Sequence, residues 1–431
     1  MKSHPNRFIR VAAVALALVA PHAQAATSLW TGAVNGNWNT TTPNWSNGGS
    51  GNYTTGDIVQ FGDTGGANLG ISIISAVTPA SVTFTDNGAG TNAYTFSTSG
   101  INGTGTTVTL DSGFGGSAQF NVSNGYTGAT TINGGKLIYN NNVTTASASH
   151  AIASGATLEL NGARTNTANT TFSGAGTLLK TGAGTTAWSG AATFALGAGS
   201  LIDVQAGQLT GGNSANEVWT TNLSDLNVAS GAIFDGVEAN VRVNKITGNG
   251  TIKTGITGFG YTALTLGVDN GSSQFDGVIA NSSAAGSIVK TGSGTITLTG
   301  ANTYTGTTTI GNGTIILGGG DNRLATAARV VLGATGTSGA LVLGNGTALN
   351  QTLAGLTTAG NGGAVVGGAA ANSTLTLNSA TDSTFSGKLG GVGTNENNLA
   401  LIKSGAGALT LSAAKHLHRR DNPQWRQSHC Q

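Results

Sequence analysis

Short runs in which apolar residues alternate with small polar ones recur along the chain. In TITLTG, Ile296 and Leu298 face one side of an extended strand, and the threonines between and beside them face the other. STLTL repeats the alternation, with Leu375 and Leu377 on the apolar side. Gly-x-Gly and Asn-Gly pairs, which tolerate the positive φ of tight turns, separate such runs. The pattern therefore predicts many short strands, each with one apolar face, joined by tight turns.

The strands belong to longer phrases that recur at intervals. The first phrase is an apolar pair, then Lys, then Thr or Ser, then a Gly-x-Gly turn and an alternating strand. The second phrase contains Tyr-Thr-Gly followed by a Thr-Thr-Ile strand. The third phrase is a single alternating strand. The first phrase occurs at residues 176–190, 286–300 and 399–412, with a short form at 250–255, the second at 124–139 and 301–319, and the third at 154–162, 338–346 and 372–379. Such recurrence indicates a repeat architecture in which each unit packs on its neighbours.

An alternating strand cannot bury its apolar face alone, but stacked copies bury it in a narrow interior. We therefore predict an all-β protein: a parallel, right-handed β-helix or solenoid over residues 124–411, with an N-terminal β cap and the first coils over 26–123. An array of β-sandwiches is the alternative, because Lys180, Lys290 and Lys403 are about 110 residues apart. The segments between these lysines are not copies of one domain, which favours the solenoid.

Tryptophan is concentrated near the N-terminus, where Trp30, Trp38 and Trp45 lie close together. A solenoid needs a cover over its core at each end, and large aromatic side chains suit that position. Spaced tryptophans on strands can also stack on sugar rings, so a glycan-binding surface is the alternative. We predict that the three tryptophans cap the solenoid.

Residues 1–25 have the organisation of a secretory signal peptide. Basic residues precede the apolar run VAAVALALVA, and AQA at residues 23–25 meets the small-residue rule for cleavage. The run is too short to span a bilayer, and no later segment approaches the roughly 18 apolar residues of a transmembrane helix. We therefore predict export through the inner membrane and a mature chain that begins at Ala26.

Composition and charge narrow the choice of partners. The 431 residues include 71 Gly and only 8% charged residues, yet 38% are hydrophobic, which is too apolar for a disordered chain. The formal net charge is +2, but seven of the 18 basic residues and only one of the 16 acidic residues lie in segments 1–25 and 412–431. The body therefore has 11 basic and 15 acidic residues, and nucleic acid is not an expected partner.

The phrases K-[TS]-G-x-G-x-L-x-L-x-G and ANTYTG-x-T-T-I resemble the autotransporter-associated β-strand repeat, also called the passenger-associated transport repeat. The resemblance covers residues 124–135, 176–190, 286–319 and 399–411, and the Trp-rich opening with GDIVQFGD is similar to the mature N-terminus of such proteins. It implies a parallel β-helix, a secreted or surface passenger of Gram-negative-type bacteria, and often a C-terminal outer-membrane β-barrel. It implies no catalytic residue, cofactor or metal, because the family's motif is structural.

Residues 412–431 depart from the pattern. The repeat requires GANTYTG after the third copy of the first phrase, but the chain continues AAKHLHRRDNPQWRQSHCQ. Codons for Lys-His-Leu-His-Arg-Arg, read one base later, can spell Asn-Thr-Tyr-Thr-Gly. We therefore predict a frame shift near residues 413–414, which gives a non-native tail and truncates the chain before its translocator barrel. A genuine basic C-terminal peptide is the alternative.

The tail also contains a set of residues that resembles a metal site: His416, His418, His429 and Cys430. Residues that arise from a shifted frame have not been selected for a purpose. We therefore predict no metal site in this segment.

A polysaccharide-active β-helix enzyme is the main functional alternative, because such enzymes place two carboxylates, or acids with Arg or Lys, around a glycosidic bond. Asp235 and Glu238, with Arg242 nearby, form the closest acidic pair of the body. Residues three apart on a strand face opposite sides, which argues against a shared site. His150, the one histidine of the body, has no Ser-His-Asp spacing around it that supports a general base.

Other motifs resemble binding sites but lack essential residues. Lys-Thr-Gly at Lys180, Lys253 and Lys290 matches one β-lactamase box without its Ser-x-x-Lys partner. INGGKL and FSGKLG do not have P-loop spacing, and GGGDNR at residues 318–323 is a lone match to calcium-binding nonapeptide repeats. The Thr-x-Thr stretches are too irregular for an ice-binding face. We therefore predict no catalytic, cofactor-binding or metal-binding residues.

These observations together predict a secreted or surface-exposed structural passenger, a stalk or adhesin-like presenter, and not an enzyme. The alternatives are a polysaccharide-active β-helix enzyme and a glycan-binding surface protein. We expect no cofactor, nucleic acid or small-molecule substrate, and the sequence does not identify a host-surface or glycan ligand. The expected location is the cell surface or the medium for a full-length form, and the periplasm if the barrel is missing.

Overall fold

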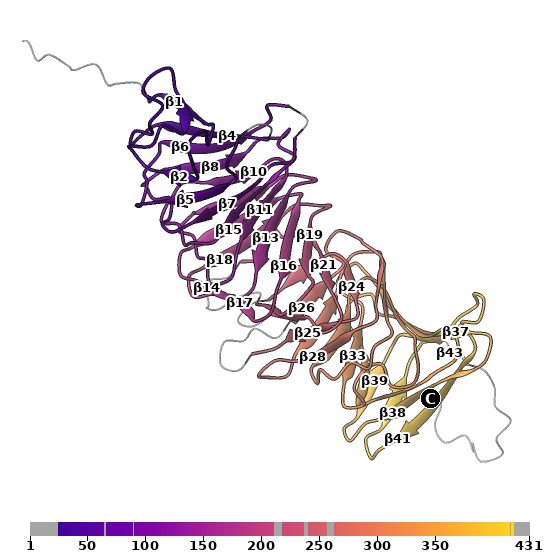
Figure 1. Cartoon of the computed structure of the whole chain (residues 1–431). Coiled ribbons are helices and arrows are strands. Elements are labelled where there is room, and N and C mark those ends of the chain that lie inside the picture. The colour runs from indigo at the N-terminus through magenta and orange to yellow at the C-terminus, as the bar shows by residue number, and fades with distance from the viewer. Residues whose placement is uncertain are drawn as a thin grey trace, which may run out of the picture.

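The computed structural model describes residues 25–63, 66–88, 90–210, 218–236, 240–256, 263–413 and 415–417. The expected signal peptide lies outside the described residues, apart from Ala25. The described chain is all-β and contains no helix. Accordingly, no helix in this part of the chain is long and apolar enough to cross a membrane. The strands stack along one axis into a rod, with the N-terminal end in indigo and the C-terminal end in yellow (Figure 1).

The rod is a parallel β-solenoid, as the sequence predicts. Every strand pair is parallel except β1 with β3. The strands form seven sheets, which join end to end into three faces of the rod. Two of the joins are contacts between strands, β24 with β27 and β36 with β39. At the remaining joins, hydrogen bonds of single residues connect one coil to the next. Most turns of the chain add one rung to the first face and one to the second, whereas the third face has a strand in only some of the turns. This arrangement excludes the array of β-sandwiches.

The first face contains β1 (Thr27–Trp30), β3 (Trp45–Ser46), β4 (Ile58–Gly62), β6 (Ser81–Thr85), β8 (Thr107–Leu110), β10 (Thr130–Ile132), β12 (Ser149–Ile152), β15 (Thr170–Gly174), β18 (Ala192–Leu196), β23 (Arg242–Val243), β26 (Ala263–Leu266), β29 (Ser287–Lys290), β31 (Thr307–Ile310), β33 (Arg329–Leu332), β36 (Gly355–Thr358), β39 (Ser383–Phe385) and β42 (Leu409–Leu411).

The second face contains β2 (Asn37–Trp38), β5 (Gly70–Ile73), β7 (Ala93–Ser97), β9 (Ser117–Phe120), β11 (Lys136–Tyr139), β13 (Thr157–Asn161), β16 (Thr177–Thr181), β19 (Leu201–Val204), β21 (Asp225–Val228), β24 (Ile246–Gly248), β27 (Ser273–Phe275), β30 (Thr295–Leu298), β32 (Gly313–Leu317), β34 (Gly339–Gly346), β37 (Gly363–Ala369), β40 (Lys388–Gly390) and β43 (Lys415–His416).

The third face contains β14 (Arg164–Asn166), β17 (Thr185–Trp188), β20 (Gln208–Thr210), β22 (Ile233–Asp235), β25 (Thr251–Thr254), β28 (Val278–Asn281), β35 (Asn350–Leu353), β38 (Ser373–Asn378) and β41 (Leu399–Ser404). Before β14 this side of the coil consists of turns with isolated parallel bridges, such as Val77 with Ile101.

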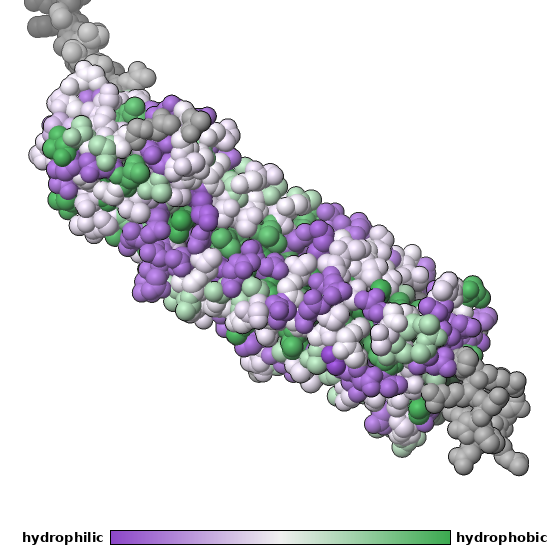
Figure 2. All heavy atoms as spheres, turned by 45° about the vertical axis from the view of Figure 1, so that its right-hand side comes forward, coloured by the Kyte–Doolittle hydropathy of each residue, from purple (hydrophilic) through white to green (hydrophobic). Residues whose placement is uncertain are grey.

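Alternation along each strand places one apolar column inside the coil. Ile296, Leu298, Leu375 and Leu377 are buried in the core, as predicted. Because parallel pairing keeps equivalent residues in register, side chains of the same kind stack from rung to rung. The outer surface seen in Figure 2 mixes hydrophilic and hydrophobic residues along the rod, without a continuous apolar area. The stability of the rod therefore depends on its interior.

The core is aromatic in the N-terminal half of the rod. Phe61 stacks on Phe84 with ring centroids 5.3 Å apart, and Phe172 stacks on Phe194 at the same distance. Trp219 continues the second stack, 4.2 Å from Phe194. Offset stacking of this kind contributes beyond the burial of apolar area. Residues further along the chain fill the same interior mainly with Ile, Leu and Val.

The N-terminal tryptophans form the cap that the sequence predicts. Trp30 pairs with Trp45 in the antiparallel β1–β3 ribbon, and Trp38 packs edge-on against Trp45 and Phe61. Trp30, Trp38 and Trp45 are all buried. A buried indole face cannot stack on a sugar ring in solvent, so this geometry supports the cap and not the glycan-binding alternative.

The C-terminal end differs from the expectation that the pattern stops at Ser412. Lys415 and His416 form β43, which pairs in parallel with Leu389 and Gly390 of β40. The Lys415 ammonium donates to the backbone oxygens of Gly387 and Ala413, at 3.0 and 2.6 Å, and stands 5.8 Å from the ring centroid of the buried Phe385. A segment without the repeat pattern is expected to be disordered or loosely laid on the end of the solenoid, and the pairing of these two residues contradicts that expectation. Residues 418–431 lie outside the described part, and the frame shift stays a prediction.

Candidate functional site: clamps between coils

The lysine of the first phrase is buried and bonded to backbone oxygens. Lys180 ends an inward-facing column of β16, where it aligns with Leu160 and Val204 of the neighbouring rungs. Its Nζ donates to the oxygens of Thr181 at 2.6 Å and Gly182 at 2.7 Å in its own corner, and to Ala206 of the next coil at 3.1 Å. The ammonium therefore donates hydrogen bonds to backbone carbonyls of two successive corners.

Lys290 repeats this clamp one phrase later. Its Nζ donates to the oxygens of Thr291, Gly292 and, across the coil boundary, Asn312. Burial lowers the pKa of both Lys180 and Lys290 to about 8, and the nearby Arg164 adds to the effect at Lys180. The three acceptors around each Nζ replace the water that the ammonium loses on burial. Lys403 makes the first two of these bonds, to Ser404 and Gly405.

The glycine that follows the lysine is required by the backbone. Gly182 and Gly292 have φ of 65° and 62°, the left-handed region that L side chains rarely adopt. This conformation turns the corner and points the preceding carbonyls back at the ammonium. The Lys-Thr-Gly sequence thus forms a structural corner at Lys180 and Lys290.

Lys253 does not form this clamp, although it also stands in Lys-Thr-Gly. The short phrase GTIKTG has one residue fewer between its first Gly and Lys than GTLLKTG. Because side chains alternate between faces, one missing residue places Lys253 on the outer side of β25, while Ile252 and Thr254 are buried. Lys253 therefore shares the Lys-Thr-Gly sequence with the other two lysines but not their clamp.

The tyrosine and threonine of the second phrase form a buried pair. The Tyr126 hydroxyl lies 2.9 Å from Thr130 Oγ1, and the Tyr304 hydroxyl lies 2.6 Å from Thr308 Oγ1. All four side chains are fully buried. Gly306 between the second pair has no room for a side chain, since a Cβ there would lie 2.3 Å from the backbone oxygen of Gly286.

An asparagine precedes each tyrosine and joins two coils. Asn124 Oδ1 accepts from the backbone N–H of Ile101 at 2.9 Å, and Asn302 Oδ1 accepts from Ile279 at 2.8 Å. Both asparagines are buried. The sequence displays these residues in its repeated phrases, but nothing in the sequence indicates which polar residues of a phrase turn inward.

His150 lies in the core and belongs to a hydrogen-bonded chain of polar side chains. Its Nε2 is 3.2 Å from the Tyr139 hydroxyl and its Nδ1 is 3.0 Å from Thr170 Oγ1, while Tyr139 also contacts the Tyr126 hydroxyl at 3.0 Å. Burial, assisted by the charge of Arg164, lowers the pKa of His150 to about 3. The imidazole is therefore neutral and enclosed, a geometry that does not support a general base acting on a substrate.

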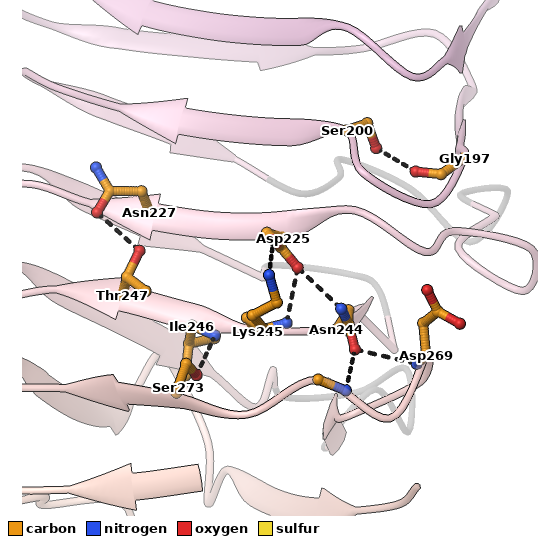
Figure 3. Close-up of polar contacts among 11 residues, drawn as sticks. Gly197, Ser200, Asp225, Asn227, Asn244, Lys245, Ile246, Thr247, Asp269 and Ser273 are labelled. Atoms are coloured by element: carbon orange, nitrogen blue, oxygen red, sulfur yellow. Dashed lines mark hydrogen bonds and ion pairs between the residues drawn. The ribbon is translucent and has the colours of Figure 1, made fainter. Parts of the chain in front are cut away.

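Carboxylates near coil corners are bonded to the neighbouring coil. In Figure 3, Asp225 pairs with the Nζ of Lys245 at 2.8 Å and accepts from Nδ2 of Asn244 at 3.0 Å. Asn244 Oδ1 in turn accepts from the backbone N–H of Asp269 at 3.2 Å and Gly271 at 2.8 Å. One polar cluster thus joins three successive coils, which is a structural use of these groups.

Of the two acidic residues considered for glycan cleavage, the structure describes only Asp235. Asp235 is 5% exposed and lies on β22, where it aligns with Thr210 and Lys253 on the third face. Arg242 lies on β23 of the first face, and Glu238 lies outside the described residues. The arrangement leaves the enzyme hypothesis with one described carboxylate that is almost inaccessible to a polymer.

The calcium-like segment 318–323 also bonds between coils. Asp321 accepts from the backbone N–H and side chain of Asn350, at 2.7 and 3.1 Å, and these bonds lower the pKa of the carboxyl. Arg323 donates to the oxygen of Thr299 at 3.0 Å. Across the described ranges, no three His, Cys, Asp or Glu side chains form a group that could hold a metal. His416 is described, whereas His418, His429 and Cys430 are not.

A shallow groove of about 330 Å³ lies near the C-terminal end. Its polar side chains are Ser338, Asn361, Ser386 and Lys388, and the backbones of stacked glycines and alanines line the rest. This lining includes neither a carboxylate nor a histidine, so it offers no acid–base pair for hydrolysis.

Comparison with protein families identifies these phrases. The model of the passenger-associated transport repeat matches residues 115–138, 288–317 and 401–415. The matched segments contain the Asn-x-Tyr pairs described above, together with Lys290 and Lys403. Searches of curated proteins and of solved structures gave no match. The chain therefore contains passenger-associated transport repeats, and the matched segments include the asparagines and the lysine that bond one coil to the next.

Proposed function

We propose that this protein is a structural passenger of an autotransporter-type system: an exported, surface-exposed rod that acts as a stalk or adhesin-like presenter. The observation on which the proposal rests is the use of the repeat motif. Its lysine and asparagine bond to the neighbouring coil, and its tyrosine and threonine bond to each other in the core, so the polar groups of the described repeats hold the rod together. The family match and the predicted signal peptide support export.

The proposal includes an absence of glycan-cleaving activity. The double variant Asp235→Asn with Glu238→Gln removes the closest acidic pair, and we expect no change in reducing-end release from a panel of polysaccharides. Turnover by the wild-type chain that disappears in the double variant would favour the polysaccharide-active enzyme instead.

Export is tested in the producing cells. We expect the mature protein to begin at Ala26 by mass spectrometry, and antibodies against the cap to label intact cells or the medium. The matched control replaces Leu16 and Leu18 with Arg, which breaks the apolar run of the signal peptide. Unprocessed protein confined to the cytoplasm, with or without these changes, would refute the proposal.

A further inference from the structure

Arg164 is a buried cation with most of its donors unused. It lies on the inner side of β14 with 4% exposure, and its guanidinium stands over the ring of Tyr139 at 5.9 Å. Only Nη2 finds acceptors: the backbone oxygens of Tyr139, Asn140 and Asn161. Nε and Nη1 are buried and have no partner. A guanidinium carries five N–H groups, so three of them remain unsatisfied.

Among the described residues, Arg164 has a second cation nearby and no ion-pair partner. Lys180 is close enough for the charge of Arg164 to lower its pKa. The ion pairs of the described residues, Lys136 with Glu159 and Lys245 with Asp225, involve neither of these cations. Burial lowers the pKa of Arg164 to about 10, so the side chain is charged at neutral pH. An unpaired charge in a closed interior is strongly unfavourable.

The adjacent strand offers a further unused donor on the same inner side. In the register between β14 and β17, Arg164 aligns with Thr186, and Asn166 aligns with Trp188 two residues on. The Trp188 side chain is fully buried and its Nε1 has no partner. Guanidinium and indole N–H groups can only donate, so a ligand common to them must be an acceptor.

We infer that the interior between β14 and β17 binds a small monovalent anion, a halide such as chloride, against the free N–H groups of Arg164. A halide accepts from several donors at once and needs no acceptor on the protein. It also neutralises the charge that Arg164 and Lys180 bring into the core. The close-packed interior of a solenoid excludes larger oxyanions. The bound anion is thus an internal structural ligand of the rod.

Bromide provides the direct test, because its anomalous scattering identifies it in a crystal. Crystals of the protein grown in sodium bromide should show an anomalous peak within hydrogen-bond distance of Nε or Nη1 of Arg164. In solution, chloride or bromide should raise the thermal midpoint by about 1–3 °C over sodium gluconate at equal ionic strength, with saturation.

Matched variants separate the site from general salt effects. Arg164→Met should abolish the halide-specific shift, whereas Arg323→Met, at a half-buried arginine that also bonds a carbonyl, should retain it. If Arg164→Met does not fold, the wild-type crystal decides the question. Water without bromide at Arg164, or a halide shift that survives in folded Arg164→Met, overturns the inference.

Discussion

Two lysines in the same three-residue sequence have opposite environments. Lys290 is enclosed by three carbonyls, whereas Lys253 lies on the outer side of its strand. The difference comes from one residue of spacing, since alternation fixes which face a strand position occupies. The motif letters alone therefore do not define the role of a lysine, but the letters together with the distance to the preceding glycine do.

The two lysines give a matched pair of variants. Lys290→Met should destabilise the protein by about 2–4 kcal/mol, because the backbone oxygens of Thr291, Gly292 and Asn312 would lose their donor inside the rod. Lys253→Met should change stability by less than about 0.5 kcal/mol, as expected of a surface substitution. Urea unfolding monitored by tryptophan fluorescence measures both, and equal effects of the two variants would contradict the clamp.

His150 makes a specific contribution to acid sensitivity. Its pKa is about 3 in the folded chain against 6.5 in the reference state, so below about pH 6.5 the unfolded chain binds a proton that the folded chain does not. The free energy of unfolding should therefore decrease as the pH is lowered from about 6.5 towards 3, by up to about 1.4 kcal/mol per pH unit from this residue. The groups that face the ring are Tyr139, Thr170 and the cation of Arg164.

His150→Phe isolates this contribution. Phenylalanine can continue the stack on Phe172, whose ring lies 5.3 Å from that of His150, and it has no proton to gain. The variant should show a weaker loss of stability between pH 7 and pH 4.5 than the wild-type chain, whatever its stability at pH 7. An identical pH dependence of the two proteins would show that His150 is not responsible.

At the scale of one coil, the second phrase is held by a buried hydroxyl pair. Removing the hydroxyl of Tyr304 alone, or of Thr308 alone, leaves its partner without a hydrogen bond in the core. Each single change, Tyr304→Phe or Thr308→Val, should cost about 1–2 kcal/mol. The double variant should cost less than the sum, with a coupling of about 1 kcal/mol.

The neighbouring position Thr309 is the control for this cycle, because its side chain faces outward on the same strand. Thr309→Val should have little effect and no coupling to Tyr304→Phe. Additive effects of Tyr304→Phe and Thr308→Val would mean that the hydroxyl pair does not act as a unit.

The sequence predicts the coil more completely than it predicts the clamps. Strand alternation correctly assigns Ile296 and Leu298 to the interior, because the side chains of a strand point alternately to its two faces and the apolar face is the one that is buried. The inward positions of Lys180 and Arg164 run against that rule, since charged residues are ordinarily exposed. Backbone carbonyls of adjacent coils converge on both side chains, and this convergence is a property of the stacked fold.

The cap and the last coil illustrate the same limit. The clustering of Trp30, Trp38 and Trp45 predicts a cover for the core, but only their burial in the structure decides between that cover and a sugar-stacking surface. The pairing of Lys415 with β40 is not indicated by its sequence, which lacks any strand pattern. Parallel pairing there uses backbone groups, which any residue except proline supplies.

At the scale of the whole molecule, the three faces run without interruption past the change from an aromatic to an aliphatic core. Each coil contacts its two neighbours, so the rod has a constant rise of about 4.8 Å per coil. A passive rod of this kind suits the presentation of its cap at a distance from its C-terminal end. The central claim is therefore that distance along the rod grows linearly with coil number.

Distances between paired spin labels on the first face test this claim most directly. Cys430→Ser removes the one natural cysteine. Three double-cysteine variants are then made, each with Thr83→Cys and one of Ser173→Cys, Thr265→Cys or Val331→Cys, and all four positions face outward. Double electron–electron resonance should give label separations of about 19, 38 and 53 Å, for roughly four, eight and eleven coils at about 4.8 Å each. Separations that do not increase in this proportion, or a far pair no longer than the near pair, would contradict a single continuous solenoid.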